Sequence, residues 1–264
     1  MSHHFINIDS YEKFVKAFHT LSGLDLNFYK ENQMKRRINN FMNTHNHKDD
    51  YTGFLKTLSQ DPKLFDGFFK HLTINVTQFF RDIKLWDIFQ DKIIPDLVQK
   101  KNNLKLWSAG CSAGQEAYTM AIIMNEYFPN TKYSILGTDI DVNVLKQARL
   151  GTYDERDFAS TPENILQKYF TLGDRQYQVK DDLKRSMTFQ EQNLLTDRFD
   201  QGFDFIACRN VVIYFTDDAK DLLYKKFADS LNPGGILFTG STEHLFGKNH
   251  LGLKPVSSFF YQKQ

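Results

Sequence analysis

The chain has 264 residues, and its 41% hydrophobic and 25% charged content is typical of a globular protein with one large domain or two ordinary ones. Its 33 Lys and Arg residues nearly balance its 32 Asp and Glu residues, which argues against a wholly basic nucleic-acid-binding protein. Two cysteines, Cys111 and Cys208, exclude a disulfide scaffold. No apolar run is long enough to cross a bilayer, and residues 1–9 lack the basic and apolar regions of a signal peptide, so we expect a cytoplasmic protein.

The N-terminal part of the chain reads as helical. Apolar residues recur at helical spacing in two stretches, Tyr11-Phe14-Val15-Phe18 and Met34-Ile38-Phe41. Asp61 followed by Pro62 predicts an N-cap and the first position of a further helix that continues to Leu72. No strand pattern appears before about residue 100, so we expect a helical domain over residues 1–75 and a second domain over 76–264.

The second part alternates between strands and helices. The predicted strands cover residues 104–107, 133–138, 187–189, 203–208 and 236–239, and the predicted helices cover 116–127, 141–148 and 217–231. This alternation predicts an α/β fold with a parallel, doubly wound sheet. Residues 169–190 break the pattern with short alternating runs around Gly173-Asp174, which predicts a small antiparallel insertion.

Small and polar residues follow the predicted strands. Residues 107–116 contain two glycines between a strand and a helix, which is typical of a loop that lets a nucleotide approach the backbone, or of a plain tight turn. Asp139 ends the second strand, where a carboxylate can accept hydrogen bonds from a ribose, and Asp141 is expected to cap the next helix. Polar residues also end the third and fourth strands, at 191–194 and 208–211, and a turn is expected at 232–235. Because no G-x-G-x-x-G pattern is present, S-adenosylmethionine fits this edge better than NAD.

The chain resembles the CheR-type chemotaxis receptor methyltransferases over nearly its full length. The strongest matches are four blocks, at Thr73–Arg81, Trp107–Glu116, Thr138–Asp141 and Cys208–Phe215. The resemblance implies a small all-helical N-terminal domain and a Rossmann-like class I methyltransferase domain with a small β insertion. It also implies transfer of a methyl group from S-adenosylmethionine to glutamate side chains on the cytoplasmic methylation helices of chemoreceptors, so that the enzyme would be recruited to membrane-bound receptors.

The resemblance also assigns residues. The implied cofactor contacts are Asn75, Thr77, Arg81, Glu116, Asp139, Asn193, Leu194, Arg209 and Asn210. Arg81 and Tyr214 would lie nearest the transferred methyl and are the candidate catalytic residues. The family usually has Gly-Glu-Glu-Pro-Tyr where this chain has Gly114–Tyr118, and the second glutamate is retained as Glu116. The insertion is short at residues 172–176, which argues against the tethering of a receptor C-terminal pentapeptide.

The residues suit this chemistry without a general base. A glutamate with a pKa of about 4.3 is already ionised at neutral pH, so the enzyme mainly aligns the reactants and removes water. Arg81 can hold a carboxylate of the cofactor or of the substrate with its planar fork, or it can form a surface ion pair with Asp82 or a neighbouring residue. Tyr214 can orient the substrate through a hydrogen bond. No metal site is expected, because His3, His4, His45 and His47 lack partners at metal-ligand spacing.

The second predicted helix has a basic, polar face. Gln33, Arg36, Arg37 and Asn40 share this face, and Lys30 and Lys35 add positive charge. It is either a solvated surface or a docking surface for an acidic partner, and the resemblance favours docking of a receptor through Lys35, Arg36 and Arg37. The alternatives for the whole chain are a methyltransferase of the same fold with another substrate, a silent cofactor-binding scaffold, and an NAD oxidoreductase. DNA is disfavoured by the near-neutral charge and by the absence of an Asn-Pro-Pro-Tyr-type motif after the fourth strand.

Overall fold

The computed structural model describes residues 8–245 and 249–264. The first seven residues, which include His3 and His4 and the segment without signal-peptide character, lie outside this description. The chain divides into two compact units. One comprises Met1–Ile74 and Tyr214–Lys220, and the other comprises Asn75–Ile213 and Asp221–Gln264.

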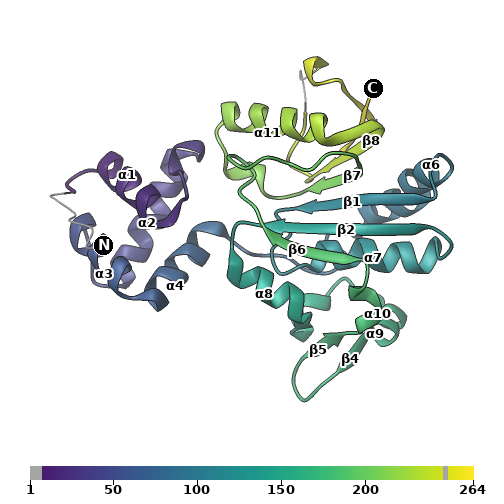
Figure 1. Cartoon of the computed structure of the whole chain (residues 1–264). Helices are drawn as coiled ribbons and strands as arrows, with labels where there is room; N and C mark the ends of the chain where they lie inside the picture. The colour runs from purple at the N-terminus through teal and green to yellow at the C-terminus, as the bar shows by residue number, and fades with distance from the viewer. Residues whose placement is uncertain (1–7, 246–248) are drawn as a thin grey trace. The chain divides into compact units, whose positions relative to one another are not determined.

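The helical unit contains four α-helices and one short turn of 3-10 helix among its described residues (Figure 1). They are α1 (Tyr11–Ser22), η1 (Leu26–Phe28), α2 (Glu31–Thr44), α3 (Tyr51–Gln60) and α4 (Pro62–Thr73). The apolar faces expected from the sequence are buried, and Phe14, Phe18 and Ile38 have no exposed surface. Asp61 caps α4 as predicted, since its Oδ1 accepts hydrogen bonds from the backbone N–H groups of Lys63 (2.9 Å) and Leu64 (3.1 Å).

The second unit is built on a seven-stranded sheet with the order β6-β2-β1-β7-β8-β10-β9. Its strands are β1 (Asn103–Ala109), β2 (Lys132–Asp139), β6 (Met187–Glu191), β7 (Phe203–Cys208), β8 (Leu231–Thr239), β9 (Leu253–Ser257) and β10 (Phe260–Lys263). Figure 1 shows β6, β2, β1, β7 and β8 as neighbouring arrows, and these strands pair in parallel. The predicted α/β fold is therefore confirmed.

Helices connect these strands. The longer ones are α7 (Gln115–Tyr127), α8 (Val142–Leu150) and α11 (Asp217–Ser230), at the places where helices are predicted. The chain enters the sheet through α5 (Ile83–Ile88), a π-helical turn η2 (Phe89–Ile93) and α6 (Ile94–Val98). Further short helices are η3 (Glu155–Phe158), α9 (Glu163–Tyr169), α10 (Asp181–Lys184), η4 (Val212–Tyr214) and η5 (Asn249–Leu251).

The prediction of the strands is wrong in two details. The sheet is not wholly parallel, because β10 pairs antiparallel with both β8 and β9. The alternation of this C-terminal hairpin is obscured by Lys254 and Pro255 in β9, which is an edge strand and tolerates proline. Residues 232–235 lie within β8 rather than in a separate turn, at an irregularity in its pairing with β7.

The predicted antiparallel insertion is present, but its limits differ. The strands β4 (Phe170–Leu172) and β5 (Tyr177–Val179) form the expected hairpin around residues 173–176, beside α9 and α10 (Figure 1). The third strand of this small sheet is β3 (Thr152–Tyr153), which was not predicted because it is only two residues long. Residues 187–191, by contrast, belong to the main sheet as β6.

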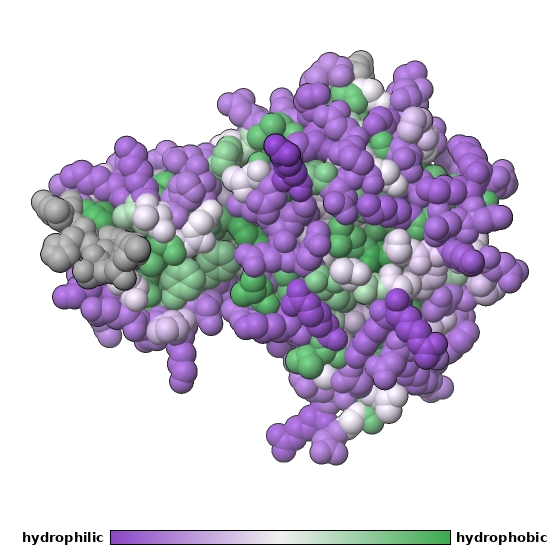
Figure 2. Space-filling view, viewed as in Figure 1, coloured by the Kyte–Doolittle hydropathy of each residue, from purple (hydrophilic) through white to green (hydrophobic). Residues whose placement is uncertain are grey.

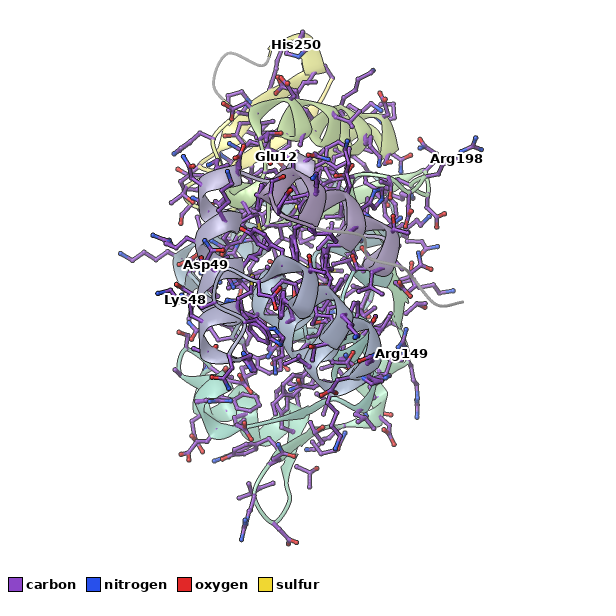
Figure 3. All side chains as sticks on the ribbon, turned by 90° about the vertical axis from the view of Figure 1, so that its left-hand side faces the viewer. Glu12, Lys48, Asp49, Arg149, Arg198 and His250 are labelled. Atoms are coloured by element: carbon purple, nitrogen blue, oxygen red, sulfur yellow. The ribbon has the colours of Figure 1, made fainter. Side chains whose placement is uncertain are left out.

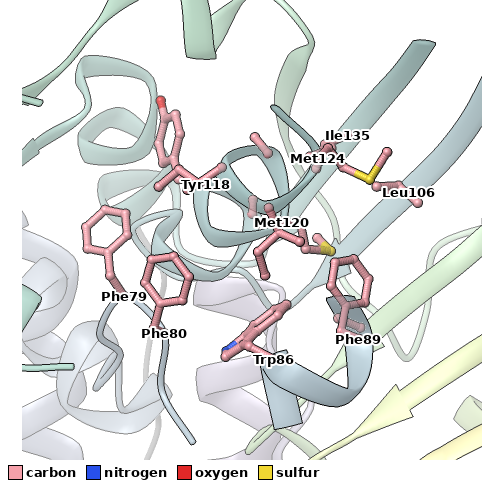
Figure 4. Packing of buried hydrophobic residues seen from close by; sticks show 14 of the residues in the cluster. Phe79, Phe80, Trp86, Phe89, Leu106, Tyr118, Met120, Met124 and Ile135 are labelled. Carbon is pink, nitrogen blue, oxygen red and sulfur yellow. The ribbon is translucent and has the colours of Figure 1, made fainter. Parts of the chain in front are cut away.

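The core of the second unit is rich in aromatic residues, as the 25 phenylalanines of the whole chain suggest. Figure 4 shows side chains of α5 and η2, among them Trp86 and Phe89, beside Met120 of α7 and Leu106 of β1. Phe238 of β8 stacks on Phe260 of β10 with ring centres 4.1 Å apart, so the C-terminal hairpin is anchored in the same core. This packing holds the strands whose ends carry the predicted site.

Hydrophilic residues dominate the visible face of the molecule, and hydrophobic side chains occur there in small, separate groups (Figure 2). Within residues 8–245 and 249–264, no helix is both long and apolar enough to span a membrane.

Candidate cofactor-binding site

The sheet order reverses direction between β1 and β7. The strands β2 and β6 lie on one side of β1 in the sheet, and β7 and β8, which follow them in the sequence, lie on the other side. Ligands of such sheets bind outside the carboxyl ends of the strands at this change of direction. Predicted site residues lie at or just after the ends of β1, β2, β6 and β7, and a further group lies at residues 75–81, before the first strand.

The loop after β1 brings the backbone close to its neighbours. Gly114 has a φ of 92°, which favours glycine, and a Cβ atom at Gly110 would lie 2.5 Å from Cγ2 of Val211 in the loop after β7. The backbone N–H groups of Gly110 and Cys111 both donate to the carbonyl of Thr138 at 2.8 Å, which ties this loop to the end of β2. Two buried polar atoms of the loop, Ser112 Oγ and Gln115 Oε1, have no hydrogen-bond partner within the described part of the chain. A polar ligand at this loop would satisfy them.

Asp139 lies at the end of β2 and is 7% exposed. Its Oδ2 accepts the N–H of Ser112 at 2.8 Å, and its Oδ1 accepts the N–H of Asp141 at 3.0 Å. Burial raises the pKa of Asp139 from its usual 3.8 to about 6, although these two N–H groups oppose the shift. Each carboxylate oxygen has a second lone pair, so Asp139 can still accept from a ligand hydroxyl.

Asp141 caps α8, as predicted. Its Oδ1 accepts the N–H of Asn143 at 2.9 Å. Its Oδ2 accepts a hydrogen bond from Nδ2 of Asn75 at 2.8 Å, so a predicted cofactor residue from the start of this unit is held beside the end of β2.

Glu116, at the start of α7, and Arg209, after β7, form a buried ion pair. Arg209 Nη1 lies 3.4 Å from Glu116 Oε2, and the hydroxyl of Ser108 donates to Glu116 Oε1 at 2.8 Å. Burial raises the pKa of Glu116, while Arg209 and the Ser108 hydrogen bond oppose that shift. Glu116 is thereby fixed at the start of α7, next to the glycine-containing loop.

The other side of the Arg209 guanidinium holds the turn that carries Arg81. Its Nη2 donates to Asp82 Oδ2 at 2.7 Å and to the carbonyl of Arg81 at 3.1 Å. The guanidinium also lies 4.7 Å from the ring centre of Phe238. Asp82 therefore pairs with Arg209, and the alternative in which it pairs with Arg81 is wrong.

Backbone strain concentrates in the same loops. Phe80 and Asp82, on either side of Arg81, have φ values of 53° and 60°, and Ser112 and Asn210 have values of 49° and 59°. Such values are unfavourable for residues other than glycine and persist where surrounding contacts impose them. Arg81 itself is half-buried and donates one hydrogen bond within the described part of the chain, from Nη1 to the carbonyl of Val76 at 3.0 Å. Thr77 lies in the same segment and is half-buried.

The loop after β6 is held by its own hydrogen bonds and by α11. Asn193 Oδ1 accepts the N–H of Leu195 at 3.0 Å, and Leu194 is buried. Lys226 of α11 donates from Nζ to the carbonyl oxygens of Leu194 (2.7 Å), Leu195 (3.3 Å) and Asp197 (2.7 Å). Lys226 cannot be recognised from the sequence, because an ammonium that binds backbone carbonyls about 30 residues away leaves no local pattern.

The remaining predicted residues belong to the helical unit. Tyr214 groups there, since its carbonyl accepts the N–H of Lys30 at 2.9 Å. Lys35 is paired with Glu31 at 2.5 Å, and Arg37 donates to the carbonyl of His71. Arg36 is exposed and forms no ion pair or hydrogen bond with the residues that the structure describes.

The carboxyl ends of these strands have the features that an adenosine cofactor with an amino-acid tail requires. They are a loop with close backbone approach, a buried carboxylate for a diol, and the charged residues Glu116 and Arg209 beside them. No group of three or more His, Cys, Asp or Glu residues that could hold a metal ion occurs within the described ranges. This fold and site define the class of S-adenosylmethionine-dependent methyltransferases.

Comparison with known families agrees with this class. Residues 75–258 match the CheR methyltransferase SAM binding domain, and residues 9–73 match the CheR methyltransferase all-alpha domain. The chain belongs to the CheR methyltransferase family and is an S-adenosylmethionine-dependent methyltransferase.

Three relatives illustrate the similarity, and each is named a chemotaxis protein methyltransferase. The protein of Listeria innocua is 40% identical over 242 residues, which cover 91% of this chain and 92% of the relative. The protein of Listeria monocytogenes is 39% identical over the same length and the same shares of both chains. The protein of Borreliella burgdorferi is 33% identical over 262 residues and covers 93% of this chain and 92% of the relative.

Proposed function

We propose that this protein transfers the methyl group of S-adenosylmethionine to glutamate side chains of chemoreceptors and forms glutamyl methyl esters. The relatives' names place their activity in chemotaxis. The observation that carries the proposal is the state of the Arg81 side chain. Arg81 is half-buried, its guanidinium donates one hydrogen bond to the carbonyl of Val76, and Arg209 binds the backbone carbonyl of Arg81. A planar guanidinium in this state can receive the two oxygens of a carboxylate.

The reaction needs alignment rather than proton transfer. The cofactor supplies an electrophilic methyl group on a positively charged sulfur. A glutamate oxygen forms the new bond to the methyl carbon on the side opposite the sulfur, and the electrons of the methyl–sulfur bond remain on sulfur. Because the attacking carboxylate is already ionised near neutral pH, no side chain has to act as a base. The contribution of the protein is to orient the two groups and to keep water away.

The site residues divide by place. Asp139 accepts the ribose hydroxyls, and Glu116, fixed by Ser108 and Arg209, binds the cationic amino group of the methionine part. Further contacts come from the segments at Asn75 and Thr77, at Asn193 and Leu194, and at Arg209 and Asn210. Arg81 acts on the carboxylate that receives the methyl, and Tyr214 is the second proposed catalytic residue.

The two parts of the chain have different tasks in this proposal. Residues 1–75 dock the cytoplasmic methylation helices of a receptor, and residues 76–264 carry out the transfer, with the β insertion at about 169–190 as an appendage. Arg36 is the strongest docking cation, because Lys35 and Arg37 are already engaged inside the helical unit. Figure 3 views this unit face on and shows charges of both signs, among them Glu12, Lys48 and Asp49.

The proposed partner is a receptor protein and no nucleic acid. The enzyme works in the cytoplasm and reaches the membrane only by binding receptors. The short hairpin connection at residues 173–176 argues against tethering by a C-terminal pentapeptide.

The test is transfer of labelled methyl from S-adenosylmethionine to receptor-containing membranes, followed by mild base. We expect label on the receptor that base releases as methanol, because esters hydrolyse and methylamines do not. The Asp139→Ala variant is the control for site-dependent transfer. Base-stable label, or label on nucleic acid in a matched incubation, would contradict the proposal.

A further inference from the structure

Glu243 lies in the segment after β8 and is 4% exposed. Its Oε2 accepts two backbone hydrogen bonds, from the N–H of Gly240 at 2.7 Å and from the N–H of Asn210 at 2.9 Å. A carboxylate is a stronger acceptor of such bonds than a neutral group. A buried carboxylate with this arrangement has a specific structural task rather than a solvating one.

The two N–H groups belong to neighbouring strand ends. Asn210 follows β7, which ends at Cys208, and Gly240 follows β8, which ends at Thr239. Cys208 and Thr239 are paired in the parallel ladder, so both loops leave the sheet at the edge where the cofactor site lies. One carboxylate oxygen therefore joins two adjacent loops at the ligand edge.

The loop after β7 needs such a support. Asn210 has a φ of 59°, a left-handed conformation that costs free energy for any residue with a side chain. The N–H groups of Asn210, Gly240, Ile213 and Val212 all lower the pKa of Glu243 against the raising effect of burial, so the carboxylate faces several amides of this loop. Their joint attraction offsets the cost of the strained backbone.

Gly240 is fitted closely to this contact. A Cβ atom at Gly240 would lie 2.5 Å from Glu243 Oε2 and 2.9 Å from the N atom of Asn210. Contacts under 3.0 Å force a displacement, so only glycine leaves the carboxylate and the amide at hydrogen-bonding distance. A substitution at Gly240 therefore disturbs the hydrogen bond between Glu243 and Asn210 without changing Glu243 itself.

We propose that Glu243 is a positioning residue for cofactor binding, which fixes the backbone of Asn210 and with it the cofactor-binding segment after β7. The inference rests on the proposed function, in which Arg209 and Asn210 contact S-adenosylmethionine. Glu243 itself touches neither cofactor nor substrate in this account.

A buried carboxylate at the opposite end of β7 provides the matched control. Asp204 is 5% exposed and accepts from Lys101 Nζ, from the N–H of Lys105 and from Asn232 Nδ2. Asp204 is the second residue of β7, and Asn210 follows the other end of this strand. Asp204 therefore lies away from the edge of the sheet at which the cofactor site is proposed. Its loss affects folding stability but not the loops of the site.

The experiment compares four purified variants, Glu243→Ala, Glu243→Gln, Gly240→Ala and Asp204→Ala, by melting temperature and by calorimetric titration with S-adenosylhomocysteine. We expect Glu243→Ala and Gly240→Ala to weaken binding about tenfold or more. Glu243→Gln keeps an acceptor oxygen and should bind more tightly than Glu243→Ala. Asp204→Ala should melt at a lower temperature and bind as the wild type does.

The outcomes separate this inference from the proposed function. Wild-type protein that binds no S-adenosylhomocysteine would contradict the proposed function itself. If the wild type binds and either Glu243→Ala or Gly240→Ala binds equally well, the positioning role alone is wrong. Should Glu243→Ala not fold, Gly240→Ala decides, because it removes no polar group. If Asp204→Ala loses as much affinity as Glu243→Ala, the inference is also contradicted. The loss in both variants would then come from lower folding stability and not from the position of Asn210.

Discussion

We predict that Asp139 sets the pH dependence of cofactor binding. Its pKa is raised by burial to about 6, so the ionised acceptor is lost as the pH falls through this value. We expect S-adenosylhomocysteine affinity to weaken on going from pH 7 to pH 5. The Asp139→Asn variant should bind about tenfold more weakly at pH 7 and show a flatter profile, because removal of a charged acceptor costs about 1.5–3 kcal/mol. Calorimetry across this range checks both, and identical profiles for the two proteins would contradict the role of Asp139.

Arg81 should matter for transfer far more than for folding. Its side chain makes one hydrogen bond to Val76, while its carbonyl, which any residue retains, accepts from Arg209 and from Trp86 Nε1. We therefore expect Arg81→Ala and Arg81→Lys to change the free energy of unfolding by no more than about 1 kcal/mol. Both should lose most methyl transfer, because lysine lacks the fork. Near-normal turnover in Arg81→Lys would show that transfer does not need a planar guanidinium–carboxylate pair at this position.

Sequence reasoning reached some of these residues and missed others for a physical reason. The ends of β1 and β2 are visible in the sequence, because glycines and an aspartate follow short apolar runs. Glu243 and Lys226 act on backbone groups about 30 residues away, and no residue-type pattern records which amide or carbonyl they reach. The same holds for Asp82, whose partner Arg209 lies 127 residues further along the chain.

At the scale of elements, α2 shows that charge on a helix face does not by itself define a docking surface. The sequence groups Lys35, Arg36 and Arg37, but the three side chains differ in the structure. Burial lowers the pKa of Arg37, which donates to the carbonyl of His71 on α4. Arg37 thus contributes to the packing of α2 on α4, and Arg36 is left as the exposed cation.

Reversing these two charges should therefore have different effects. Arg36→Glu should slow receptor methylation several-fold at low salt and leave the melting temperature and cofactor affinity unchanged, because it makes the encounter with acidic helices repulsive. Arg37→Glu should lower stability by about 1–3 kcal/mol. Lys48→Glu, an exposed change of equal charge elsewhere in the helical unit, is the control. Equal methylation rates for Arg36→Glu and Lys48→Glu would remove docking from this face.

The loop after β6 depends on α11 through one ammonium group. Lys226→Met keeps the side-chain volume and removes the donor to three carbonyls, so we expect a loss of about 1–3 kcal/mol in stability. The cofactor should also bind more weakly, because Leu194 belongs to the loop that is released. Lys225→Met, which removes only an exposed ion pair with Asp229, should change neither quantity. Denaturant titration and calorimetry on both variants test this coupling.

At the scale of the whole molecule, the order of elements was predictable and the closing pieces were not. Alternating apolar strands and helices from residue 103 onward predict the five parallel strands of the sheet. The C-terminal hairpin of β9 and β10 could not be predicted from the sequence, because both strands are short and β9 is a polar strand at the edge of the sheet. The helical unit was recognisable from apolar residues at helical spacing. Its phenylalanines pack on one another, and the ring centres of Phe54 and Phe68 lie 4.9 Å apart.

The division of the chain into a docking part and a transfer part also belongs to this scale. The two family matches meet between residues 73 and 75, and the segment Tyr214–Lys220 groups with the helices. Tyr214 is thus attached to the helical unit, while the proposed cofactor contacts all lie in the other. In this account, receptor methylation needs both units and cofactor binding needs only the second.

The central claim is that the methyl group is transferred to glutamate side chains of a chemoreceptor. Its most direct test is peptide mass spectrometry of a receptor cytoplasmic region after incubation with the enzyme and S-adenosylmethionine. The account predicts methyl esters on glutamates of the methylation helices with the wild type, and none with Arg81→Ala. Methylation on lysine, arginine or a backbone terminus, or an unmodified receptor in the presence of an enzyme that binds the cofactor, would contradict it.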